Sequence, residues 1–278
     1  MFESTMRVRA LVEDVIRELG DNPPNFLSLG RRDDELNFAR RHMDSYIRTI
    51  SDINCLLGPG TKSILEIGAF TGVVSICLKR LGHAIEALDI PEFFADPHVK
   101  DYYDRHGVKT HAVNLRHAIL PLESSRFDVV IMCETLEHLN FNPIPALALL
   151  EISRVLKQGR FLYLAMPNLA RLPNRVKLLL GRQIYGPIDD FFLQLDPHYN
   201  VIVGLHWREY TMAETKHLLQ RLGFSIERDY FYSASYATTN LLRMLLFAAV
   251  PRWRSTLVVA ARKEKMPQIE VWRTEANS

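Results

Sequence analysis

The sequence predicts an α/β protein in which helices cover both faces of a mostly parallel sheet. Short apolar runs rich in β-branched residues alternate along the chain with longer patterns of helical period. A glycine-bearing turn follows the first such run, within Ser63 to Gly72, and an acid, Asp89, stands at the end of the next run. Because α/β sheets bind nucleotide-like cofactors at the carboxyl ends of their strands, we expect a cofactor to lie across this turn.

The glycines of the turn narrow the choice of cofactor. Gly68 permits backbone angles and a close ligand approach that a Cβ atom would block. Gly72 lets the next helix begin with its free N–H groups facing a ligand. The dinucleotide pattern G-x-G-x-x-G would also need glycine at Phe70 and Val73, so the sequence disfavours NAD and FAD.

The turn resembles the first motif of class I S-adenosylmethionine-dependent methyltransferases, and the chain is similar to the methyltransferase type 11/23 group and to ubiquinone-pathway O-methyltransferases. In that family the turn lies under the methionine part of the cofactor, and the acid after strand two binds the ribose hydroxyls. Asn114 follows the third expected strand, where the family more often has Asp beside the adenine. The resemblance implies a set of cofactor-binding residues: Glu66, Gly68, Ala69, Phe70, Gly72, Asp89, Asn114, Leu115 and Glu134.

The later elements arrive in the order that the family has. After a helix over about 72–81, the expected strands and helices are 108–113 (strand), 127–133 (strand), 149–156 (helix, closed by 157–160 with its glycine), 161–168 (strand), 212–222 (helix), 225–231 (strand) and 255–261 (strand). The resemblance covers about residues 62–263. It implies a Rossmann-like seven-stranded sheet of order 3-2-1-4-5-7-6 whose last strand is antiparallel.

Three additions flank or interrupt this core of residues 61–264. Residues 1–60 contain two helical patterns, 6–19 and 33–57, which either cover the cofactor or simply pack on the sheet. Residues 169–205 are rich in arginine and aromatic residues, and such an insertion after a strand predicts a lid over the substrate. Residues 265–278 form a polar tail.

Candidate catalytic residues follow the fourth strand and the lid. Glu134, Glu137 and His138 would share one face if a helical turn follows the strand, and His206 stands just before a helix start at Thr211. We expect His138, His206 and Glu137 to serve catalysis, as base or substrate ligands. The same residues with Glu134 could instead hold Mg²⁺, Mn²⁺ or Zn²⁺. This set is similar to the Glu-x-x-Glu-His plus distant His of RNA 3′-end methyltransferases, although the motif often only contacts the cofactor.

Composition and charge limit the partners. The net charge of +2 does not suggest a nucleic-acid footprint, so a small-molecule acceptor is expected. The three cysteines fit reduced thiols of a cytoplasmic protein, and the first residues lack the apolar core of a secretion signal. No apolar run approaches the roughly 20 residues that cross a bilayer. Residues 240–254 combine an apolar helix with arginines, which predicts either peripheral membrane contact or a helix that covers the sheet.

Three functions therefore remain open at this point. The first is methylation of a hydroxyl of a small molecule, sugar or lipid-linked precursor, with S-adenosylmethionine as cofactor. The second is metal-dependent 2′-O-methylation of RNA 3′ ends, and the third is a non-catalytic cofactor-binding scaffold.

Overall fold

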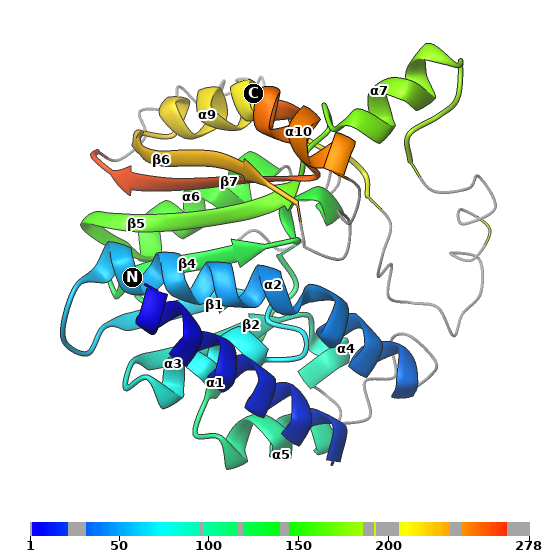
Figure 1. Cartoon of the computed structure of the whole chain (residues 1–278). Coiled ribbons are helices and arrows are strands. Elements are labelled where there is room, and N and C mark those ends of the chain that lie inside the picture. Colours follow the sequence, from blue (N-terminus) through cyan, green and yellow to red (C-terminus); the bar gives the residue numbers. More distant parts are fainter. Residues whose placement is uncertain are drawn as a thin grey trace, which may run out of the picture.

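A computed structural model describes residues 2–21, 32–94, 97–115, 119–139, 145–185, 192, 206–233 and 241–265. Within them seven strands form one sheet in the order β3-β2-β1-β4-β5-β7-β6 (Figure 1). The strands are β1 (Ser63–Ile67), β2 (Ala84–Asp89), β3 (Lys109–Ala112), β4 (Phe127–Cys133), β5 (Leu156–Pro167), β6 (Phe224–Tyr232) and β7 (Thr256–Lys263). Only β7 runs antiparallel to its neighbours β5 and β6, so the expected sheet order and the antiparallel last strand are confirmed.

Helices cover both faces because successive strand residues point to opposite sides. In β1, Ile64 belongs to one apolar cluster and Leu65 to the other. The first face carries α1 (Phe2–Asp21), α2 (Arg32–Leu57), α3 (Val73–Arg80), α4 (Pro91–Phe94) and α5 (Pro97–Arg105). The second face carries α6 (Pro145–Val155) and α9 (Met212–Arg221). Two further helices are α7 (Leu172–Leu179), which extends away from the sheet, and α10 (Leu241–Ala249), which lies beside α9 near β6 (Figure 1).

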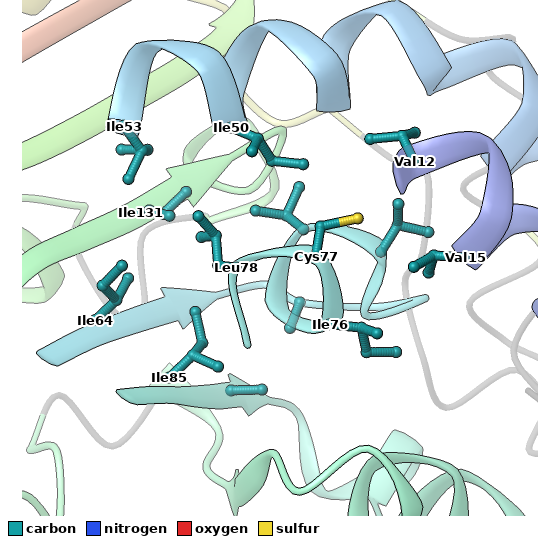
Figure 2. Packing of buried hydrophobic residues seen from close by; sticks show 14 of the residues in the cluster. Val12, Val15, Ile50, Ile53, Ile64, Ile76, Cys77, Leu78, Ile85 and Ile131 are labelled. Atoms are coloured by element: carbon teal, nitrogen blue, oxygen red, sulfur yellow. The ribbon is translucent and has the colours of Figure 1, made fainter. Parts of the chain in front are cut away.

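The two N-terminal helices are part of the core of the first face. Figure 2 shows Val12 of α1 and Ile50 of α2 directed at the same space as Cys77 of α3 and Ile131 of β4. All four side chains are buried. The apolar cluster thus continues across residue 60, and the division there into cap and core stays a prediction.

Polar side chains of α2 also fix that helix to the sheet. Asp52 is buried and accepts hydrogen bonds from Tyr163 of β5 (3.0 Å), from the hydroxyl of Tyr230 and from Arg228 (2.9 Å) of β6. Two helical turns earlier, Ser45 accepts a bond from the Tyr232 hydroxyl (2.9 Å). These bonds hold α2 against β5 and β6.

The start of β5 differs from the sequence expectation. We expected residues 157–160 to close a helix and the strand to begin at residue 161, but β5 begins at Leu156, directly after α6. Leu156 already pairs with Phe127 of β4, and the register then shifts so that Phe161 pairs with Val129. Gly159, with φ of 71°, belongs to this irregular stretch rather than to a helix end.

Candidate functional site

The turn between β1 and α3 is shaped by close contacts of its two glycines. A Cβ atom on Gly68 would lie 2.0 Å from Oγ1 of Thr135, and one on Gly72 would lie 2.9 Å from the ring of Tyr103. Both glycines also have positive φ, 77° and 71°. The glycines are therefore required by packing within the protein, from β4's end on one side and α5 on the other.

Phe70 connects this turn to the surrounding elements. It has a positive φ of 42°, which is uncommon for a residue with a side chain and costs free energy. Its carbonyl accepts a hydrogen bond from the Tyr103 hydroxyl (3.0 Å), and its ring lies 5.4 Å from Phe38 of α2 and 5.5 Å from Phe93 of α4. The N-terminal helix α2 thus reaches the turn, and its covering of a cofactor stays a prediction.

Asp89 ends β2 beside the turn. Its carboxylate accepts hydrogen bonds from the backbone N–H groups of Phe70 and Ile90, both at 2.8 Å. Burial raises the pKa of Asp89 to about 6 in spite of these two donors. The backbone of Val113 donates to the carbonyl of Asp89 (2.9 Å), so Asn114 and Leu115 follow directly beside this acid.

Glu66 points into the first face of the sheet rather than out of its edge. Its carboxyl is buried and accepts a hydrogen bond from the Ser75 hydroxyl of α3. Burial raises the pKa of Glu66 to about 8, although the bond from Ser75 acts in the opposite direction. The contact with α3 is a structural role that the sequence did not suggest, and its expected contact with the cofactor stays a prediction.

The end of β4 turns sharply into the second half of the site. Glu134 has a positive φ of 47°, and its N–H donates to the Ala165 carbonyl of β5 (2.7 Å). A short 3-10 turn, Leu136–His138, follows in place of the α-helical turn that we expected. The three- and four-residue spacing of an α-helix therefore does not apply here, but the turn still buries Glu137 beside Glu134.

Glu137 is an unusual buried acid. It is fully buried, and by distance and angle neither carboxyl oxygen makes a hydrogen bond with a described residue, although the Glu134 carboxyl lies close enough to interact with it. Burial, together with the neighbouring Glu134 carboxyl, raises the pKa of Glu137 well above its usual range. Burial also raises the pKa of Glu134 to about 7, although His206 and Arg171 partly offset this. A buried polar group without a hydrogen-bond partner costs free energy. A ligand that supplied such a partner to Glu137 would remove that cost and bind more tightly.

The segment after the lid completes this cluster. The backbone N–H of Trp207 donates to the Glu137 carbonyl (2.8 Å), which brings His206 to His138 with 5.0 Å between ring centroids. One ligand atom each of Glu137, His138 and His206 lies within 4.8 Å of the others. The structure therefore brings together the three expected catalytic residues, which stand on two segments about 70 positions apart in the sequence.

Glu209 orients His206 and is itself held by α7. Its carboxylate is buried and contacts Nδ1 of His206 (3.1 Å), Nη2 of Arg171 (2.9 Å) and Nδ2 of Asn174 (2.9 Å). Burial alone would raise the pKa of Glu209, but His206, Arg171 and Asn174 outweigh it and hold the pKa below its usual value. Glu209 thus stays a carboxylate and fixes the ring of His206.

Residues 65–164 match the family model of a methyltransferase domain. They include the turn, Asp89, the β4 end and Glu137. The chain carries a class I S-adenosylmethionine-dependent methyltransferase domain. The turn of residues 66–72 resembled the first motif of methyltransferases, and the enzyme class predicted from it is thus confirmed. No curated protein matches the chain.

Solved structures of methyltransferases share the fold at low sequence identity. One is a chain of the complex between the Haloferax volcanii Trm112 methyltransferase activator and a candidate methyltransferase: 15% identity, TM-score 0.60, covering 87% of this chain and 99% of that chain. A candidate histamine N-methyltransferase from Thermotoga maritima has 17% identity and TM-score 0.52, covering 84% and 95%. A Mesorhizobium loti S-adenosylmethionine-dependent methyltransferase has 17% identity and TM-score 0.52, covering 80% and 97%. At these identities the likeness concerns the fold.

The residues at the turn fit the methyl donor. A carboxylate has about four acceptor positions, and Asp89 uses two of them for backbone N–H groups, which leaves acceptor positions for two ribose hydroxyls. The raised pKa of Asp89 shows that its charge is poorly compensated in the protein alone. The Asp89 carboxylate also gives this edge of the sheet a negative charge, which suits a cationic cofactor.

Sequence reasoning missed several residues that shape the site. Thr135, Tyr103, Phe38 and Glu209 were not expected to take part, and Arg171 was noted only as one arginine of the lid. Glu209 had a visible signal, since it lies three residues after His206, but its partners in α7 could not be paired with it from spacing. Of the predicted lid, residues 186–191 and 193–205 lie outside the described residues, as does nearly all of the tail 265–278.

Proposed function

We propose that this S-adenosylmethionine-dependent methyltransferase methylates a hydroxyl oxygen of a small molecule, a sugar or a lipid-linked precursor. The observation that carries the proposal is the cluster of Glu137, His138 and His206 at the strand ends next to the cofactor turn. A hydroxyl acceptor needs its proton removed or its oxygen polarised, whereas a bare cofactor pocket offers neither.

His206 is the candidate base. Its Nδ1 contacts the Glu209 carboxylate, so Nε2 is the atom left to accept the proton from an acceptor hydroxyl. Glu209 stabilises the imidazolium that results, and Arg171 and Asn174 hold Glu209 in place. Burial and the neighbouring Glu134 carboxyl raise the pKa of Glu137 and so favour its protonated form, which can donate a hydrogen bond to the acceptor. These residues bind and orient the acceptor and take up its proton.

The methyl donor would be held by the turn and by Asp89, with Ala69, Phe70, Asn114, Leu115 and Glu134 along its length. When bound, S-adenosylmethionine supplies an already activated methyl group. The protein's remaining task at this half is to hold the donor in line with the acceptor and to exclude water. The ring of Phe70, packed against Phe38 and Phe93, closes this side of the turn.

A second candidate function is metal-dependent methylation of a 2′-hydroxyl at an RNA 3′ end. The specific observation that favours it is that one carboxylate and two imidazoles present ligand atoms within 4.8 Å of one another, with Glu134 next to them. Mixed oxygen and nitrogen ligands suit Zn²⁺ and Mn²⁺, and carboxylates suit Mg²⁺. The near-neutral net charge of +2 makes the first function the preferred one.

Calorimetry with S-adenosylmethionine, in buffer with EDTA and in buffer with added Mn²⁺ or Zn²⁺, separates these functions. We expect binding in both buffers, weakened by Asp89→Ala. Formation of S-adenosylhomocysteine with phenolic, sugar and polyprenyl acceptors then tests catalysis. Turnover that survives EDTA supports the base mechanism, whereas turnover that requires the metal and an RNA end supports the second function. A protein that binds the donor but turns over none of these acceptors would fit the scaffold function and contradict both proposals.

A further inference from the structure

Exposed apolar side chains of this protein are concentrated in two elements. Of the twelve large apolar side chains that are exposed among the described residues, seven lie in α7 and the residue after it or in α10, and five (Met6, Ile119, Leu147, Tyr185 and Phe192) lie elsewhere. The seven are Val176, Leu178, Leu179, Leu180, Leu241, Met244 and Leu245. Leu179 is the most exposed of these, at 86%. Exposed apolar patches of this kind mark interaction sites.

The same two elements carry only positive charge. Residues 169–185 contain Arg171, Arg175, Lys177 and Arg182, residues 241–256 contain Arg243, Arg252 and Arg254, and neither range contains Asp or Glu. These seven charges contrast with the whole chain, whose 34 basic and 32 acidic residues give +2, so the remainder of the chain carries −5. Within the described part of the chain, Arg175, Lys177, Arg182 and Arg252 form no ion pair with an acid.

The two elements are neighbours in space. Asn168, at the end of β5 and four residues before α7, donates hydrogen bonds of 2.9 Å to the carbonyls of Arg252 and Arg254. Those carbonyls belong to the turn that follows α10, and the N–H of Asn168 also donates to Ser255 (2.8 Å). Figure 1 shows α7 extending away from the sheet from a point beside the end of α10. Residues 172–182 and 241–254 thus form one apolar and basic surface, here called the α7–α10 surface.

The distribution of apolar side chains on α7 distinguishes between kinds of partner. Leu178, Leu179 and Leu180 are consecutive and all exposed, so they point in different directions around the helix end. A groove on another protein contacts one stripe of a helix, whereas a fluid apolar medium can surround a helix end on all sides. On α10 the exposed side chains Leu241, Met244 and Leu245 do form one stripe, which suits a helix lying flat at an interface.

We propose that the α7–α10 surface docks on an anionic lipid bilayer, with the tip of α7 inserted and α10 lying along the interface. Acidic headgroups attract the cations of the surface, and the leucines enter the acyl region. Trp253 is half-buried and lies between Arg252 and Arg254 in the sequence. Tryptophan side chains favour the headgroup level of a bilayer, so Trp253 would lie at that level in the docked protein. No described helix is long and apolar enough to cross a membrane.

Docking at this surface would place the candidate site at the membrane. Arg171 caps the start of α7 and Asn174 lies in its first turn, and both hold Glu209, which contacts His206. The base of the docking helix is therefore bonded to the residue that orients the candidate base. A lipid-linked acceptor would meet the site from the interface, although the docking itself does not depend on the proposed methyl transfer.

Vesicle flotation of the full chain, without cofactor or acceptor, tests the docking. We expect binding to vesicles of phosphatidylcholine with phosphatidylglycerol and much weaker binding to phosphatidylcholine alone. Each lost cation should weaken binding about fivefold. The triple variant Arg175→Gln, Lys177→Gln, Arg182→Gln should then bind about a hundredfold more weakly. Leu178→Ser with Leu179→Ser should also lose binding to the acidic vesicles.

Matched variants elsewhere control for general charge and apolarity. Arg7, Arg41 and Arg221 are exposed and lie away from the α7–α10 surface. Changing all three to Gln removes the same net charge as the first triple variant, and it should weaken vesicle binding by no more than about fivefold relative to the wild type. Ile119→Ser removes an equally exposed apolar side chain and should have no effect. The proposal is overturned if the folded protein does not float with acidic vesicles, or if both triple variants lose binding equally. It is also overturned if sedimentation shows a dimer that Leu178→Ser with Leu179→Ser dissociates, because a second copy then covers the surface.

Discussion

The site has a donor half, where the methyl donor is expected to bind, and an acceptor half, and the two differ in how their buried acids are hydrogen-bonded. On the donor side, Asp89 receives two backbone N–H groups at 2.8 Å, and the turn beside it is fixed by Thr135 and Tyr103. On the acceptor side, Glu137 receives no hydrogen bond from the described residues, and the ligand atoms of two histidines lie within 4.8 Å of it. A preorganised donor site binds one fixed ligand, whereas a buried acid without a hydrogen-bond partner next to two imidazoles is typical of a catalytic site.

The largest expected effect concerns this acceptor half. His206→Gln and Glu137→Gln, each alone, should lower kcat by about 10² to 10⁴, the usual contribution of general acid–base catalysis. Because burial raises the pKa of Glu137 and favours its neutral form, the neutral, isosteric Gln should be tolerated at this position and the fold should survive. S-adenosylmethionine affinity, measured by calorimetry, should change by less than about twofold, since binding depends on the other half.

The comparison between the halves would break if either variant lost donor affinity together with activity. Glu209→Gln provides a finer control, because Glu209 touches His206 and not the acceptor. It should shift the pH dependence of kcat by removing the carboxylate that stabilises the imidazolium, while a purely structural role would lower kcat equally at all pH values.

The next effect belongs to the donor half and uses two glycines of positive φ. Gly68→Ala places a Cβ 2.0 Å from Oγ1 of Thr135, whereas Gly82→Ala, at φ of 91°, meets nothing within 4 Å. Both variants should lose about 1 kcal/mol of stability through backbone strain, and Gly68→Ala should lose more because its Cβ overlaps Thr135. Only Gly68→Ala should weaken donor binding, by about tenfold or more, because the turn must shift. Thr135→Ala in the same chain should restore part of that affinity, and equal binding by both glycine variants would contradict the packing role.

A smaller effect is the pH dependence of donor binding. The carboxylate form of Asp89 accepts hydroxyl hydrogen bonds, and its pKa is about 6. Affinity should therefore be constant above pH 7 and fall by up to about tenfold per pH unit below pH 6. Asp89→Asn should bind more weakly and show no such fall. Calorimetry between pH 5 and pH 8 checks this, and a wild-type profile that stays flat would mean that Asp89 does not bind the donor through its charge.

The same contrast explains what the sequence could and could not predict. The donor half consists of segments that follow one another directly in the sequence: a strand, a turn, a helix and a strand. Gly68, Gly72 and Asp89 could therefore be placed from spacing alone. The acceptor half joins the end of β4 to residues 206–209 and to the start of α7. Its ligand set was predicted by resemblance, but the Glu209–Arg171–Asn174 contacts depend on how the chain returns to the sheet. The 3-10 turn at Leu136–His138 and the early start of β5 were missed because local period does not reveal a bulge or a tight turn.

The last effect concerns stability alone and tests whether the buried acids of the donor half destabilise the fold. Glu66 has a pKa of about 8 in the folded protein because it is buried, against a usual value near 4.5 when exposed. The folded state therefore binds more protons than the unfolded state between these pH values, and stability falls as the pH rises through that window, by at most about 1.4 kcal/mol per pH unit. Glu66→Gln removes this slope and should be more stable than the wild type at pH 8 but not at pH 5. Urea unfolding midpoints at both pH values measure the difference, and parallel profiles for the two proteins would show that Glu66 is ionised in the fold and that the donor half tolerates its charge.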